Sequence, residues 1–136
     1  MSYLLDTNVV SEGMKPRPDQ RVKDWFGSVN GEDLYISVLV IGEVVQGIEA
    51  LRRRDALRAR AYQEWLDDLM RQYGPRILPI TTEVAEEWGK MGVLDPVPVV
   101  DGLMAATAKV HGLTFVTHDT SDVARTGVKL LNPFLS

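Results

Sequence analysis

The sequence contains no cysteine and only two histidines among its 136 residues. The absence of thiols excludes disulfides, thiolate catalysis and metal sites built from cysteine. Two histidines are also too few for a zinc site of the usual kind. Any metal ion must therefore be held mainly by oxygen atoms, which the 19 aspartate and glutamate side chains supply.

Long apolar runs and an excess of basic charge are missing as well. No segment offers the roughly 20 apolar residues that a membrane span requires, and the opening residues, interrupted by Asp6, do not resemble a signal peptide. We therefore expect a cytoplasmic protein with no membrane association. A net charge of −4 and a pI near 5.1 argue against indiscriminate coating of nucleic acid. They leave room for a nuclease, because a carboxylate pocket that binds cations is itself a source of negative charge.

The size and the hydrophobic pattern predict one α/β domain. A length of 136 residues fits a single unit, residues 1–136, and 45% hydrophobic residues suffice for one core. Short apolar segments alternate with helical stretches. The expected strands are 3–5, 34–36, 77–78, 114–116 and 128–131, and the expected helices are 19–28, 37–52, 55–73, 82–91 and 98–111. This alternation favours a three-layer domain, with a mainly parallel five-stranded sheet and helices on both faces.

Two of the expected helices form an antiparallel hairpin. In the helix 37–52, the core face carries Val40, Val44, Ile48 and Leu51. In the helix 55–73, the expected apolar stripe is Leu57, Ala61, Trp65, Leu69 and Tyr73. The tip carries Arg52, Arg53 and Arg54, followed by Arg58 and Arg60. This charge run is typical of a solvated hairpin, although it is also suited to guiding RNA.

Four acidic residues from distant parts of the sequence are expected at one edge of the sheet. Asp6 ends the first strand and Asp119 follows the fourth, while Glu43 and Asp101 lie in early turns of helices that begin at that edge. In open parallel sheets, ligands bind beyond the carboxyl ends of the strands. Clustered carboxylates repel one another unless a cation lies between them, and Mg²⁺ or Mn²⁺ prefers oxygen ligands. The pattern therefore predicts a metal-dependent hydrolytic site.

Each acid also has a structural interpretation. Asp6 is equally suited to capping a short helix, Asp101 is favoured near a helix N-terminus, and Asp119 and Asp122 suit turns or caps. Glu43 is harder to explain structurally, because it lies in the apolar run 38–45, where an unpaired buried carboxylate is costly. The prediction therefore depends on the four acids together.

Four segments resemble a known family: L-L-D-T-N-V-V-S-E, I-S-V-L-V-I-G-E-V-V-Q-G-I, P-V-V-D-G-L-M-A-A-T-A-K-V-H-G-L and F-V-T-H-D-T-S-D with L-N-P-F. Together they are similar to PIN-domain ribonuclease toxins of the VapC type, particularly the FitB-like branch, over nearly the whole chain. The resemblance implies a Mg²⁺- or Mn²⁺-dependent endoribonuclease that acts on RNA, is usually a homodimer, and is held inactive by a cognate antitoxin protein.

The resemblance also assigns roles to individual residues. It implies that Asp6, Glu43 and Asp101 are catalytic and bind metal, with Asp119 in the fourth acidic position. Asp122 is a second candidate for that position. Some relatives have asparagine at the position of Asp119 and retain the acid at the position of Asp122. Side chains expected to support the acids are Asn8, Ser37 and Thr117. His118 stands where relatives often have arginine, and neither it nor His111 is predicted to be catalytic.

Other functions have weaker support in the sequence. An aspartyl-nucleophile phosphohydrolase resembles Asp-x-Asp at the first strand end, where this chain has Asn8 and no later lysine motif. A receiver-like signalling domain normally has an acidic pair ahead of the end of the first strand and a lysine after the last strands, and neither is present here. A catalytically inactive PIN fold that binds RNA or protein is the main alternative. An inhibitor is expected to contact the helix that carries Trp25 and Phe26 and the Arg52 hairpin, with a basic side chain directed at the acids.

Overall fold

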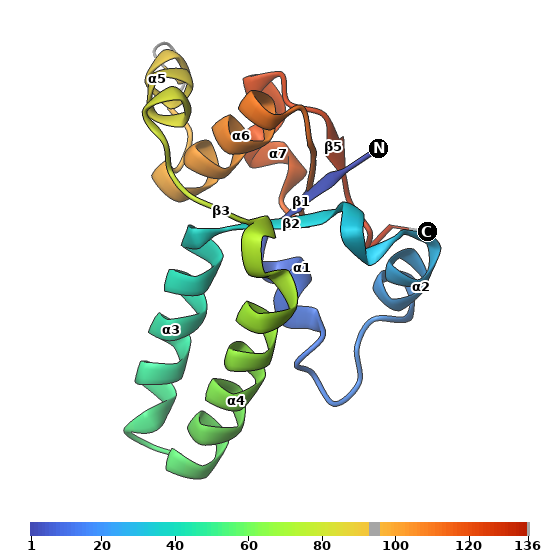
Figure 1. The fold of residues 1–136 in the computed structure, drawn as a ribbon, viewed down its shortest axis with the longest axis vertical. Coiled ribbons are helices and arrows are strands. Elements are labelled where there is room, and N and C mark those ends of the chain that lie inside the picture. Colours follow the sequence, from blue (N-terminus) through green and yellow to red (C-terminus); the bar gives the residue numbers. More distant parts are fainter. Residues whose placement is uncertain (93–95, 136) are drawn as a thin grey trace.

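A single five-stranded parallel sheet forms the centre of the molecule. The computed structural model describes residues 1–92 and 96–135. The strands follow the order β3-β2-β1-β4-β5, and every neighbouring pair is parallel (Figure 1). Their bounds are β1 Tyr3–Leu5, β2 Leu34–Ser37, β3 Ile77–Leu78, β4 Thr114–Val116 and β5 Leu130–Leu131. The parallel sheet is as predicted, although β5 is shorter than the expected strand.

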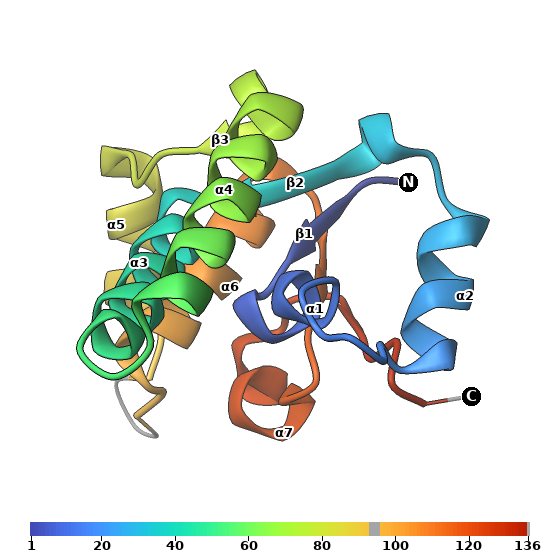
Figure 2. The ribbon, with the colours of Figure 1, turned by 90° about the horizontal axis from the view of Figure 1, so that it is seen from below.

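Helices cover both faces of the sheet, which confirms the predicted three layers. On one face lie α1 Thr7–Glu12, α2 Gln20–Ser28, α3 Val38–Arg52 and α4 Ala56–Tyr73. On the other face lie α5 Thr82–Lys90, α6 Val99–His111 and α7 Thr120–Val123. Figure 2 shows α3 and α4 side by side, with α1 between this hairpin and α2. No helix in the ranges 1–92 and 96–135 combines the length and the apolar character needed to cross a membrane.

Side-chain caps set the ends of several helices where the sequence predicts them. The Ser37 hydroxyl accepts a hydrogen bond from the Leu39 N–H at 3.0 Å, and the Asp55 carboxylate accepts one from the Arg58 N–H at 3.1 Å. Helix α6 ends at Gly112, whose φ of +66° favours a residue without a Cβ. These caps fix the starting points of α3 and α4 and the return of α6 into β4.

The core contains the strands and one face of α3. Leu4, Leu5, Ile36, Phe115 and Val116 are almost completely buried. Helix α3 buries all four of its predicted core residues. The side chains of the described strands therefore meet the helices on both faces, as expected for a parallel sheet.

The predicted core stripe of α4 was right at Leu69 and Tyr73 and wrong in its first half. Leu57 is 79% exposed and Ala61 is also exposed. The buried residues are Ala59, Leu66, Leu69 and Tyr73. Steps of four residues advance about 40° beyond a full helical turn, so a stripe with strict four-residue spacing winds around the helix. A mixture of three- and four-residue steps keeps the buried face directed at the core.

The aromatic residues of α2 and α4 pack against the core to different degrees. Trp25 and Phe26 are half-buried, and their rings meet edge to face with centroids 5.2 Å apart. Trp65 is also half-buried, and Tyr73 is buried. Tyr73 is therefore a core residue, while Trp25, Phe26 and Trp65 keep part of their surface exposed.

The connections place the carboxyl ends of β1 and β4 at a topological switch point. From β1 the chain proceeds outward to β2 and β3 in one direction, and then returns to β4 and β5 on the other side of β1. The connections on the two sides cross opposite faces of the sheet, which is the arrangement that forms the ligand-binding crevice of open parallel sheets. Asp6 and Asp119 follow these two strands and therefore lie at this crevice.

Candidate active site

Asp6 is a buried carboxylate at the end of β1. Its side chain is the N-cap of α1 and accepts a hydrogen bond from the Thr7 N–H at 2.7 Å. Its second oxygen accepts a 2.6 Å hydrogen bond from the Thr117 hydroxyl. The residue is only 6% exposed, and burial raises the pKa of Asp6, with further contributions from the negative charges of Glu43 and Asp119. The capping and site interpretations of Asp6 therefore both apply.

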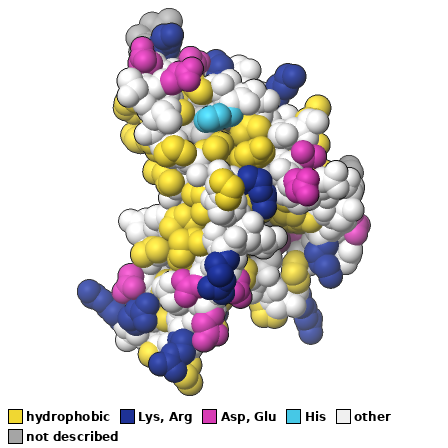
Figure 3. Space-filling view, viewed as in Figure 1, with side chains coloured by type: hydrophobic (Ala, Val, Ile, Leu, Met, Phe, Trp, Pro, Cys, Tyr) yellow, Lys and Arg dark blue, Asp and Glu magenta, His cyan; other side chains and the backbone are white. Residues whose placement is uncertain are grey.

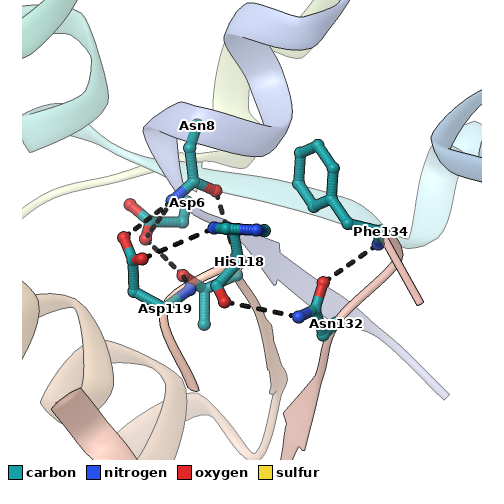
Figure 4. A network of polar contacts seen from close by, with 7 residues as sticks. Asp6, Asn8, His118, Asp119, Asn132 and Phe134 are labelled. Carbon is teal, nitrogen blue, oxygen red and sulfur yellow. Dashed lines mark hydrogen bonds and ion pairs between the residues drawn. The ribbon is translucent and has the colours of Figure 1, made fainter. Parts of the chain in front are cut away.

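Asn8 and Thr117 connect the acids that follow β1 and β4. The Asn8 amide donates to Asp6 at 3.4 Å and to Asp119 at 3.3 Å (Figure 4). The Thr117 hydroxyl, which donates to Asp6, also accepts a hydrogen bond from the Asp119 N–H at 3.1 Å. Asp119 itself is exposed. These contacts orient one buried and one exposed carboxylate toward the same crevice.

Glu43 reaches the site from the second turn of α3. It is exposed, so its place in the apolar run does not bury it. Its carboxylate accepts a 2.5 Å hydrogen bond from the Thr7 hydroxyl. Thr7 therefore joins Glu43 to the helix that Asp6 caps.

Asp101 lies in the first turn of α6, on the opposite face of the sheet from Glu43. Burial raises its pKa to about 6, and the negative charges of Asp6, Asp122, Asp119 and Glu43 add to this shift. Asp122, in the first turn of α7, is thus close enough to affect Asp101. The structure brings all five predicted acids into one electrostatic cluster.

The donor set of this cluster fits a hard divalent cation. Carboxylate oxygens are the ligands that Mg²⁺ and Mn²⁺ prefer, and a cation removes the repulsion that raises the pKa of Asp101. In the described residues, no three acidic or histidine side chains converge closely enough to hold one ion as they stand. Ion binding would therefore require the exposed side chains, chiefly Glu43, Asp119 and Asp122, to turn inward.

The loop between Thr117 and Asp119 is held from the C-terminal segment. The Asn132 amide donates to the His118 carbonyl at 3.3 Å, and its oxygen accepts from the Phe134 N–H at 2.9 Å (Figure 4). The His118 ring packs edge to face on Phe134, with centroids 4.8 Å apart, and its Nδ1 lies 3.5 Å from Oδ1 of Asp119. The N-P-F segment therefore fixes the backbone that carries Asp119.

The supporting residues differ from the prediction in part. Asn8 and Thr117 contact the acids as expected, whereas the Ser37 hydroxyl caps α3 and, in residues 1–92 and 96–135, makes no hydrogen bond with them. Thr7 and Asn132 were not predicted. Thr7 directly follows Asp6, and Asn132 belongs to the L-N-P-F segment, so their positions were the only indication in the sequence. Neither residue type predicts such a contact unless the fold is known. His111 ends α6, as its position predicts.

Comparison with known proteins agrees with this geometry. The toxin FitB of Neisseria gonorrhoeae is 33% identical over 96% of this chain and 97% of its own length. A VapC ribonuclease of Sinorhizobium fredii is 31% identical over 96% of each chain. The crystal structure of FitAcB from Neisseria gonorrhoeae superposes with a TM-score of 0.92 at 32% identity, covering 98% of this chain and 99% of that one.

The sequence also matches a protein family directly. The match is to the PIN domain and spans residues 3–129, which include all five acids of the cluster. The DNA-bound VapBC structure from Salmonella typhimurium, at 20% identity and a TM-score of 0.77, shares the fold. The chain belongs to the PIN domain family.

Proposed function

We propose that this protein is a metal-dependent endoribonuclease and the toxin of a type II toxin–antitoxin system that acts in the cytoplasm. The observation that carries the proposal is the cluster of five carboxylates at the β1/β4 switch point, in which burial, with added repulsion from the other four acids, raises the pKa of Asp101 to about 6. Full-length relatives are named as a toxin and as a VapC ribonuclease, which supports RNA as the substrate.

The acids have distinct roles in this proposal. Asp6, Glu43, Asp101 and Asp119 hold one or two Mg²⁺ or Mn²⁺ ions at the crevice, and Asp122 shares or replaces the role of Asp119. A bound ion supplies Lewis-acid stabilisation of the phosphate and lowers the pKa of a water molecule. Thr117, Asn8 and Thr7 hold the carboxylates in place through the hydrogen bonds described above. Asp101, the acid with the most strongly raised pKa, gains most from a bound cation.

An antitoxin protein inhibits the enzyme by placing a basic side chain among these acids. Solved relatives include FitAB bound to a DNA fragment, at 31% identity and a TM-score of 0.89. An arginine or lysine from the antitoxin would satisfy the carboxylates and exclude a metal ion. Its docking surface includes the half-buried Trp25 and Phe26 of α2 and the arginine-rich tip of the α3–α4 hairpin.

A homodimer is supported by exposed apolar side chains on neighbouring helices. Val38 and Val45 of α3 are 39% and 38% exposed, Trp88 of α5 is 37% exposed and Val99 of α6 is 59% exposed. Helices α3 and α5 lie on the same side of the molecule in both ribbon views (Figures 1 and 2). A second copy that covers this side would bury these residues, and light scattering of the purified protein tests the expected doubled mass.

The proposed activity is tested by incubating the purified protein with total RNA and sequencing the cut ends. We expect cleavage at a restricted set of sites when Mg²⁺ or Mn²⁺ is present. RNA binding without any cleavage would instead favour a catalytically inactive PIN module. Co-expression with the small reading frame beside its gene, followed by size exclusion, tests the antitoxin; separate elution would contradict that part of the proposal.

A further inference from the structure

A pocket adjoins the acidic cluster on the side of the α3–α4 hairpin. Its volume is about 270 Å³, and α1, α3 and α4 contribute its walls. Glu43 and Thr7 form its edge toward the acids, so the pocket opens directly beside a residue of the proposed site. Its size is near the lower end of the range of small-molecule sites, about 300 to 1,000 Å³, and suits one nucleoside-sized group.

The floor of the pocket is apolar and includes a position without a side chain. Val44, Ile48 and Leu51 of α3 are buried beneath it. Gly47 also lines the pocket, and a Cβ added there would meet no atom within 4 Å. Gly47 follows Glu43 by four residues, which is about 6 Å along the helix axis. The open space therefore begins one helical turn beyond the proposed catalytic carboxylate.

Basic, aromatic and hydroxyl groups form the wall. Arg58 lies over the Tyr62 ring, 5.7 Å from its centroid, and donates a 2.9 Å hydrogen bond to the Tyr62 hydroxyl. This contact holds the guanidinium over the pocket, and its remaining N–H groups are available to another acceptor. Arg54 lines the same wall, and the hydroxyls of Ser11 and Thr7 lie on the α1 side.

The arginines of this wall differ from two others in the hairpin, Arg52 and Arg71. Arg52 and Arg71 form ion pairs with acids three residues earlier in their own helices. Within the described part of the chain, neither Arg54 nor Arg58 has an ion-pair partner. Figure 3 shows basic side chains around the end of the hairpin, with acidic side chains among them, so an anion on this side has arginines within reach.

We propose that this pocket binds the nucleotide of the RNA substrate next to the scissile phosphate. The base contacts the Tyr62 side and the apolar floor, and the adjoining phosphate is bound by Arg58 and Arg54. Stacking surfaces combined with cationic groups are the usual means of holding single-stranded RNA, and arginine matches phosphate geometry well. The single-helix-turn separation from Glu43 leaves room for one nucleotide step between the pocket and the acids. This inference rests on the proposed nuclease function.

The first test fills the pocket. Gly47→Leu places a side chain in the open space on the surface of α3, and leucine is a better helix former than glycine, so the fold should be kept. Gly27→Leu on α2 is the matched control, because a Cβ there also meets nothing within 4 Å and Gly27 does not line this pocket. Thermal melting checks that both variants fold.

The second test removes the charge. Arg58→Gln is compared with Arg71→Gln, a change of the same kind in the same helix at an arginine paired with Asp68. Binding of a labelled, unstructured RNA octamer is measured in the Asp101→Asn background with Mg²⁺, so that cleavage does not interfere. We expect Arg58→Gln to weaken binding about tenfold. The slope of log binding constant against log salt concentration should fall by about the amount that one phosphate contact contributes, with little change for Arg71→Gln.

The outcomes separate this inference from the proposed function. We expect Gly47→Leu to weaken octamer binding about tenfold and to raise KM for cleavage, while Gly27→Leu changes neither by more than about twofold. Octamer binding that is unchanged by both Gly47→Leu and Arg58→Gln overturns the pocket proposal, even when the parent protein cleaves RNA. If these two variants leave RNA binding unchanged but weaken the complex with the antitoxin, the pocket is a contact for that protein, and the proposal of a nucleotide site is also overturned. A parent protein that cleaves no RNA with any metal instead refutes the proposed function. If Gly47→Leu does not fold, the Arg58 pair decides the question.

Discussion

The Thr117 hydroxyl donates a 2.6 Å hydrogen bond to the carboxylate of Asp6, joining the end of β4 to the end of β1 across the switch point. The same hydroxyl accepts a hydrogen bond from the Asp119 N–H. One buried side chain therefore orients two acids that are more than a hundred residues apart in the sequence. The first prediction concerns this contact.

Thr117→Val keeps the shape of the side chain but removes both hydrogen bonds. We expect the free energy of unfolding to fall by about 1 to 2 kcal/mol, because the buried Asp6 oxygen loses a donor. RNA cleavage should fall at least tenfold. The matched control is Thr107→Val, since the buried Thr107 hydroxyl donates only to Leu103 O within α6. Equal loss of activity in both variants, measured beside urea unfolding curves, would contradict a specific role for Thr117.

The repulsion around Asp101 predicts how stability depends on pH without metal. Its pKa of about 6 in the folded state is above the ordinary value of 3.8, so the folded state binds more protons between these values. The stability that this group contributes is therefore present below about pH 4 and is lost as the pH rises through about 6.

Asp101→Asn should flatten this pH dependence. We expect the difference in unfolding free energy between the variant and the parent to change by about 1 kcal/mol from pH 4 to pH 8 in chelator, after allowance for solvent screening. Urea titrations at both pH values measure it. Parallel pH profiles for the two proteins would show that the pKa of Asp101 is not raised in the folded state.

Two acids compete for the fourth position of the site, and a substitution series ranks them. Glu43→Gln should reduce cleavage about as much as Asp6→Asn, because both acids belong to the proposed metal site. Asp122→Asn should cost less than Asp119→Asn if Asp119 holds that position, since only Asp119 is tied to Asn8. The reverse order of the last two, at equal protein stability, would assign the position to Asp122.

Asn132 is expected to act on the site through the loop that carries Asp119. Asn132→Ala removes the bonds to the His118 carbonyl and the Phe134 N–H, so the loop should loosen. We expect half-maximal cleavage to need a Mg²⁺ concentration about three- to tenfold higher, together with a small loss of stability of about 1 kcal/mol. Asn30→Ala provides the control, because the Asn30 side chain makes no capping bond. If the two variants need the same Mg²⁺ concentration, Asn132 is only structural.

Much of the fold was predictable because its signals are local. Ser37, Asp55 and Gly112 mark helix ends through their own backbone preferences, and the short apolar segments identified all five strands. The face of α4 was not predictable from four-residue spacing alone, because tertiary packing against α3 selects which residues are buried.

The clustering of the acids and the contacts of Asn8 and Thr117 with them were predictable from the sequence, whereas the contacts of Thr7 and Asn132 were not. Acidic residues that follow parallel strands must share an edge, so the sequence order alone brings Asp6 and Asp119 together. The contacts of Thr7 with Glu43 and of Asn132 with His118 depend on the paths of separate segments in space. Threonine and asparagine are common in caps and turns, and no sequence pattern marks these two as part of the site.

The most direct test of the central claim is the rate of RNA cleavage by the purified protein as Mg²⁺ or Mn²⁺ is removed and restored. The account predicts that cleavage stops in excess chelator, returns when the cation is added back, and is absent from Asp101→Asn protein that was purified in parallel and melts as a folded domain. Full cleavage in excess chelator, or equal cleavage by the Asp101→Asn protein, would contradict a carboxylate-held metal as the basis of the activity.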